Sequence, residues 1–107
     1  MNERRPVIEE LNESGLLEVL RPEFLVNMAL QVMAKRADQT GGRTFSMTPA
    51  EVAHVAAVDR TMEEDRRSKR GQRIIDRIAQ LGIIEKAEDS SDQYRFTDRQ
   101  SWPRFYA

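Results

Sequence analysis

The stretch from residue 66 to residue 81, RRSKRGQRIIDRIAQL, is the feature that most constrains the fold. Wound as an α-helix at about 100° per residue, it separates into two faces. One face is apolar and carries Gly71, Ile74, Ile75, Ile78 and Leu81. The other face is a narrow basic stripe with Lys69 and Gln80 beside it, made of Arg66, Arg70, Arg73 and Arg77. We therefore expect a helix that packs on a core with one face and meets anions with the other.

Charge is distributed unevenly along the chain. The formal net charge is only −1, so the molecule as a whole is not a polycation. Residues 66–77 nevertheless hold six basic side chains and one carboxylate, a net of +5, whereas residues 1–20 have a net of −3. A local basic face on a near-neutral molecule can still position a polyanion, with weaker non-specific attraction than a wholly basic domain gives.

Length and composition limit the class of protein. The 107 residues suit one small domain and are too few for two. No apolar run approaches the roughly 18–20 residues that a membrane span needs, and the N-terminus lacks the apolar segment of a secretory signal. Cysteine is absent, which excludes disulfides and thiolate chemistry. We expect a cytoplasmic protein without a membrane partner.

Helical signals fill the first third of the chain. Apolar residues between positions 6 and 20 have helical spacing, and Ser14-Gly15 is a break or cap in this acidic segment. A second helix is expected from Pro22 to about Arg36, because an apolar stripe follows i, i+3, i+4 spacing there. Residues 38–43 (DQTGGR) are expected to form a loop, since paired glycines are costly inside a helix.

The clearest helix start in the chain follows a short β-like stretch at residues 43–47. Thr48 is a candidate N-cap, Pro49 occupies the first helical position, and Glu51 completes a capping box with Thr48. Small apolar residues up to position 57 would allow a neighbouring helix to approach closely. Residues 58–64 are either the connection to the basic helix or its early start, and Gly82 is a left-handed stop for that helix.

The remaining residues predict a β-hairpin and a tail. A strand begins at Ile83 and Ile84, a polar turn covers residues 88–93, and Tyr94 to Thr97 alternate like a half-buried strand. The tail contains three aromatic residues, which either anchor a partner or fold back over the core: Trp102, Phe105 and Tyr106. Of these two interpretations we favour the covering of the core.

Residues 22–97 resemble the winged-helix family in the order of these elements. The segments that carry the resemblance are the capped helix TPAEVAHVAA, the helix RRSKRGQRIIDRIAQLG and the hairpin IIEKAEDSSDQYRFT. The expected fold is therefore mainly α with a small β-hairpin, a winged helix-turn-helix with an extra N-terminal helix. The chain would divide into an acidic helical extension (1–21), the winged-helix domain (22–97) and the aromatic tail (98–107).

The resemblance implies that helix 66–81 is a recognition helix that docks in the major groove of duplex DNA. The residues expected at the DNA are Arg66, Lys69, Arg70, Gln72, Arg73 and Arg77. Arginine suits this surface because its fork can contact phosphate or guanine bidentately. The implied function is that of a small transcriptional regulator, binding duplex DNA in a sequence-specific or general manner and forming a homodimer.

The predicted wing departs from the family pattern. A wing that follows phosphates usually carries lysine or arginine, whereas this turn carries Glu88, Asp89 and Asp92. Carboxylates near the basic helix could also neutralise part of it through i, i+4 pairs, namely Glu63–Arg67 and Asp65–Lys69. The alternative function is therefore a winged-helix interaction module that grips an acidic surface of a partner protein.

Enzyme chemistry is not indicated by the sequence. His54 is the single histidine, and a lone histidine in a helix is far more often a packing or surface residue than a ligand. Metal sites need clusters of ligands that the sequence lacks. Gly41-Gly42 precedes no Gly-Lys-Ser/Thr, so no phosphate-binding loop is present. We expect neither a catalytic site nor a cofactor.

Overall fold

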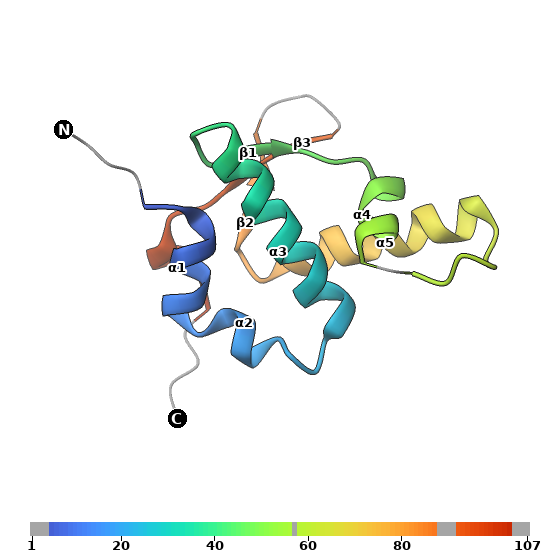
Figure 1. Cartoon of the computed structure of the whole chain (residues 1–107), viewed down its shortest axis with the longest axis horizontal. Coiled ribbons are helices and arrows are strands. Elements are labelled where there is room, and N and C mark those ends of the chain that lie inside the picture. Colours follow the sequence, from blue (N-terminus) through green and yellow to red (C-terminus); the bar gives the residue numbers. More distant parts are fainter. Residues whose placement is uncertain (1–4, 57, 88–91, 104–107) are drawn as a thin grey trace.

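A computed structural model describes residues 5–56, 58–87 and 92–103 of the chain. In this part the protein is mainly helical, with a small three-stranded antiparallel sheet (Figure 1). The elements in chain order are α1 (Val7–Ser14), α2 (Leu16–Val19), α3 (Phe24–Gln39), β1 (Thr44–Ser46), α4 (Pro49–Val55), α5 (Glu64–Gln80), β2 (Ile84–Lys86), β3 (Gln93–Phe96) and a 3₁₀ turn (Arg99–Ser101). None of the described helices is both long enough and apolar enough to span a bilayer.

The N-terminal helical segment is broken at Gly15, the position where the sequence indicated a break or cap. Gly15 has a φ of 79°, a left-handed conformation that ends α1 and precedes α2. The start of α1 is capped from a distant part of the chain. The backbone N–H groups of Val7 and Ile8 donate to the Asp38 carboxylate, at 2.7 and 3.2 Å. The acidic extension is therefore tied to the far end of α3 and shares one core with it.

Helix α3 crosses the centre of the molecule (Figure 1). The buried residues of α3 are Val26, Ala29, Leu30, Met33, Ala34 and Ala37. The prediction of a loop from residue 38 was wrong by two residues, because α3 continues through Gln39. The chain turns after Thr40, whose hydroxyl donates to the Ala37 carbonyl at 2.8 Å, and Gly41 follows with a φ of 76°.

The predicted hairpin is present and gains a third strand. Strand β3 lies in the middle of the sheet, with β1 and β2 antiparallel on either side of it. The ring of Phe45 on β1 packs against Tyr94 and Phe96 on β3, with ring centroids 5.8 and 5.4 Å apart. The last strand lies one residue earlier than predicted, at Gln93–Phe96. Most of the polar turn, residues 88–91, lies outside the described residues.

The capping box at the start of α4 is confirmed. The Glu51 backbone N–H donates to the Thr48 hydroxyl at 3.1 Å, and the Thr48 N–H donates to the Glu51 carboxylate at 3.0 Å. Helix α5 begins at Glu64, so residues 58–63 are the connection. It ends where Gly82 adopts a φ of 80°, in agreement with the predicted stop.

The described part of the aromatic tail folds back on the domain. Trp102 is buried, and its indole N–H donates to the Thr97 carbonyl and hydroxyl oxygens at 3.1 and 3.0 Å. This agrees with the interpretation that the tail covers the core. Phe105 and Tyr106 lie outside the described residues.

Candidate nucleic-acid interface

Helix α5 has the two faces that its sequence predicts. Gly71, Ile74, Ile75 and Ile78 are buried, and they attach the helix to α4 and to the core. The opposite side of α5 faces solvent. Four exposed basic residues on that side have no ion pair among the described residues, and we call them the basic face: Arg66, Lys69, Arg70 and Arg73.

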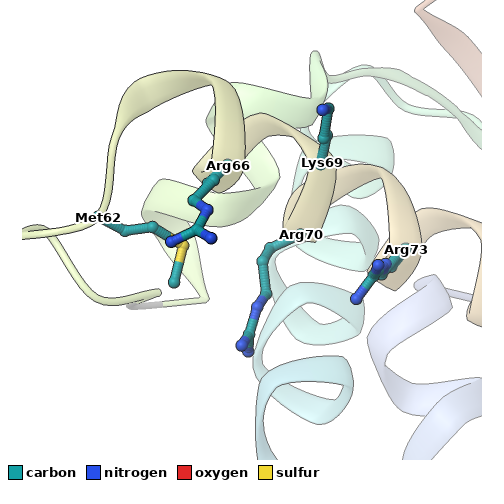
Figure 2. Close-up of a pocket in the computed structure, with 5 residues that line it drawn as sticks. All are labelled: Met62, Arg66, Lys69, Arg70 and Arg73. Atoms are coloured by element: carbon teal, nitrogen blue, oxygen red, sulfur yellow. The ribbon is translucent and has the colours of Figure 1, made fainter.

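The basic face surrounds a surface hollow of about 380 Å³ (Figure 2). Met62, in the connection before α5, completes the lining with an apolar side chain. Figure 2 shows the side chains of Arg66, Arg70 and Arg73 reaching to the same side of α5, while Lys69 leaves the helix in another direction. Three guanidinium groups thus lie on one side of α5, and Lys69 contributes to the lining of the hollow while its side chain points elsewhere.

No residue of the basic face makes an ion pair or a side-chain hydrogen bond with the described residues. The i, i+4 pairs Glu63–Arg67 and Asp65–Lys69, which the sequence offered as neutralising contacts, are not formed in the described structure. The positive charge of these four side chains therefore remains available to an external anion.

Carboxylates of the N-terminal helices are mostly neutralised within the chain. Glu10 pairs with Arg43 at 2.6 Å, Glu18 pairs with Arg21 at 2.6 Å, and Glu13 accepts from both Arg5 and Arg99. The negative charge of residues 1–20 is therefore largely compensated locally. Within residues 5–56, 58–87 and 92–103, nothing compensates the basic face on α5 in this way, although the net charge of the sequence is close to zero.

Arg77 differs from the other arginines of the predicted stripe. Its guanidinium donates from Nε and Nη2 to the two carboxylate oxygens of Glu23, at 2.9 and 3.0 Å. This fork geometry lowers the pKa of Glu23 and raises the pKa of Arg77, mainly through the side-chain hydrogen bonds. One of the side chains predicted at the DNA is therefore already paired with a carboxylate at the start of α3.

Gln72 is exposed beside the basic face, and part of its amide is already committed. Its Nε2 donates to the Asp76 carboxylate one turn later, at 2.9 Å. The sequence placed Gln72 among the DNA-binding residues without this partner. The amide oxygen and the second amide hydrogen have no partner among the described residues.

Two residues of this region were not predicted from the sequence. Met62 lines the hollow from the connection, and Glu23 holds Arg77 from 54 positions away in the chain. Periodicity along α5 could not indicate either residue, because neither belongs to that helix. The only sequence feature that could have pointed to Glu23 is its position just before an apolar helix.

The described part of the hairpin adds little positive charge. Arg95 pairs with Glu85 across the strands at 2.6 Å, which leaves Lys86 as the cation without an ion pair among residues 84–87 and 92–97. Glu88 and Asp89 lie outside the described residues, and Asp92 is half-buried at the end of the turn. The unpaired positive charge of the described residues is therefore concentrated on α5 and not on the hairpin.

Other chemistry is not indicated in the described part of the chain. His54 is exposed on α4, in agreement with a surface position. Among the residues that the structure describes, no group of histidine, aspartate and glutamate side chains is placed to hold a metal ion.

Comparisons with protein-family models, with curated proteins and with solved structures returned no match.

Proposed function

We propose that this protein is a winged helix-turn-helix protein that binds duplex DNA with α5 as its recognition helix. The order α3, β1, α4, α5, β2, β3 is the order that the sequence resemblance implies, and it supports this class. The chain would act as a small transcriptional regulator, since a domain that occupies the major groove can govern the use of the sites it covers.

The observation that carries the proposal is the unpaired basic face. Arg66 and Arg73 are seven residues apart, which corresponds to about 10 Å along a helix. The major groove of B-DNA is about 12 Å wide and admits an α-helix. The groove therefore accepts the helix itself, and the four cations, spread over about 10 Å of its length, would meet base edges and flanking phosphates.

The side chains of the basic face suit different parts of a duplex. The arginines can grip a phosphate, or the O6 and N7 atoms of guanine, with two parallel hydrogen bonds. Lys69 acts as a point charge and suits a phosphate. Gln72 retains an amide oxygen and one amide hydrogen, the pair that reads adenine. Arg77 would contribute to DNA binding only after its ion pair with Glu23 breaks.

A duplex-binding titration of the double variant Arg70→Glu/Arg73→Glu tests the proposal. Fluorescence anisotropy with a labelled mixed-sequence duplex at about 50 mM salt should detect binding by the natural chain. The double variant should lose at least about 100-fold in affinity, because two cations are replaced by repelling charges at the interface. Both side chains are exposed, so circular dichroism should show an unchanged fold.

The matched control is Arg21→Glu/Lys35→Glu, which changes the net charge equally at exposed positions away from α5. This control should keep its affinity within about threefold, since distant charges act only through screened long-range attraction. Equal loss in both double variants would mean that total charge, and not the basic face, drives binding. Tight binding by Arg70→Glu/Arg73→Glu would contradict the proposal.

A further inference from the structure

Arg77 lies on the same stripe of α5 as the basic face, although it is not part of that face. It follows Arg73 by four residues and Arg66 by eleven. At about 100° per residue, these three side chains leave the helix within about 40° of one another. With Arg77 free, the cationic stripe would lengthen from about 10 Å to about 16 Å. The stripe is therefore shortened by the partner of Arg77 and not by the sequence of α5.

That partner is Glu23, the residue just before α3. Its two carboxylate oxygens accept from Nε and Nη2 of Arg77, at 2.9 and 3.0 Å. Arginine binds a phosphate through the same two parallel hydrogen bonds. Among the ion pairs between described residues, this is the one that involves α5. The Glu23 carboxylate therefore occupies the position at which Arg77 would hold a phosphate.

The pair lies at the surface and is charged at neutral pH. The side chains of Arg77 and Glu23 are 44% and 39% exposed, so an external anion can reach the guanidinium. The hydrogen bond from Arg77 lowers the pKa of Glu23 from 4.5, which keeps the carboxylate ionised. Contact between α3 and α5 does not depend on the pair alone, because both helices bury apolar residues in one core. The charge of Glu23 can therefore be removed without dismantling the junction.

We propose that Glu23 is a built-in competitor of the duplex, which keeps Arg77 from phosphate and ends the DNA-binding stripe at Arg73. This inference rests on the proposed function, since it concerns which cations of α5 meet DNA. Each phosphate contact adds affinity whatever the base sequence. A chain with fewer phosphate contacts derives a larger share of its affinity from base edges. Glu23 thereby favours discrimination between sites over tight binding to any duplex.

The variant Glu23→Gln tests the inference, because it keeps the shape of the side chain and removes its charge. Fluorescence anisotropy with a labelled mixed-sequence duplex measures affinity at several salt concentrations. Release of Arg77 adds one phosphate contact, which steepens the slope of log K against log salt by about 0.9. The variant should therefore bind more tightly than the natural chain. Its advantage should grow about 3.5-fold as the salt concentration falls from about 200 to about 50 mM.

The matched control is Glu18→Gln, which removes the same charge from an exposed glutamate. Glu18 pairs with Arg21 at 2.6 Å, and this pair does not involve α5. The control should keep its affinity within about twofold and its slope unchanged, since distant charges are screened. The double variant Glu23→Gln/Arg77→Ala should return to the slope of the natural chain, because it has no cation to release.

A second measurement needs no variant. The Arg77 Nε–H resonance of the natural chain should stay in place when the duplex is added, because Glu23 continues to accept from it. The same resonance should shift on addition of the duplex to Glu23→Gln, where phosphate can replace the carboxylate. Nuclear magnetic resonance of the guanidinium groups, with isotope-labelled protein, records both titrations.

Three outcomes would overturn the inference. The slope of Glu23→Gln could equal that of the natural chain, or the gain could persist in Glu23→Gln/Arg77→Ala, so that lost negative charge alone explains it. The third is a shift of the Arg77 resonance in the natural chain, because Glu23 would then not hold Arg77 back. All three leave the proposed function standing, since the duplex is bound in each. Absence of duplex binding by the natural chain and by Glu23→Gln at low salt would contradict the proposed function, and this inference with it.

Discussion

Gly71 is a residue at which the backbone of α5 lies directly against the backbone of α4. A Cβ at this position would lie 1.9 Å from the Pro49 carbonyl oxygen and 3.2 Å from the Ala53 nitrogen. Both neighbours are backbone atoms, so the clash can be relieved only by moving the two helices apart. The start of α4, which the capping box fixes, thus rests directly on the middle of the proposed recognition helix.

We predict that Gly71→Ala destabilises the protein by about 1–3 kcal/mol, the usual cost of overpacking. The alanine itself favours a helix by about 1 kcal/mol over glycine, so any net loss must come from the clash. Thermal unfolding followed by circular dichroism measures the effect. Gln72→Ala, at the adjacent exposed position, should stay within about 0.5 kcal/mol of the natural chain. A Gly71→Ala variant that is as stable as the natural chain would contradict this account of the helix contact.

At the scale of elements, carboxylates hold two of the junctions together. Glu51 caps α4 and also accepts from Arg36 of α3 at 3.0 Å, while Glu23 ties the start of α3 to Arg77 of α5. The hydrogen bond from the Thr48 backbone, followed by that from Arg36, lowers the pKa of Glu51. The hydrogen bond from Arg77 lowers the pKa of Glu23. Both groups are therefore more acidic in the folded chain than in the unfolded one.

This shift predicts a loss of stability in acid. A carboxylate whose folded pKa is depressed stabilises the fold above its unfolded pKa, here 4.5, and loses that contribution as the pH falls through the folded pKa. The variant Glu23→Gln/Glu51→Gln should be less stable than the natural chain at pH 7, by no more than about 1 kcal/mol per exposed pair. Urea unfolding at pH 7 and at pH 3 measures the difference, which should shrink at pH 3. A difference that is equal at both pH values would contradict an ionic role.

The elements themselves were largely predictable, whereas the junctions between them were not. The capping box and the isoleucine face of α5 depend on residues three or four positions apart, so local spacing indicates them. The Glu23–Arg77 pair and the Asp38 cap on Val7 join positions 54 and 31 residues apart. No periodic pattern encodes such contacts, because they arise only when whole helices pack. For the same reason the sequence, which predicted Arg77 at the DNA, could not indicate that a carboxylate pairs with it.

At the scale of the whole molecule, the proposed function depends on a charge asymmetry that the net charge hides. A chain with a net charge of −1 has little long-range attraction for a polyanion. Binding would therefore come almost entirely from the four cations of the basic face. Because one such helix covers a short site, we propose that two copies bind together, with their α5 helices about 34 Å apart in successive major grooves.

The salt dependence of duplex binding tests both the number of cations and the number of chains. If all four cations contact phosphates, the slope of log K against log salt is about −3.6 for one chain and about −7 for two, and each cation that contacts a base edge instead makes it shallower by about 0.9. Titrations from about 50 to 200 mM salt measure this slope. Arg70→Ala should reduce the slope by about 0.9 per chain, because it removes one phosphate contact. Arg77→Ala should leave the slope unchanged, since Glu23 already neutralises that guanidinium. An equal reduction by both substitutions would mean that Arg77 leaves Glu23 for the duplex, and the basic face would then extend along the whole of α5.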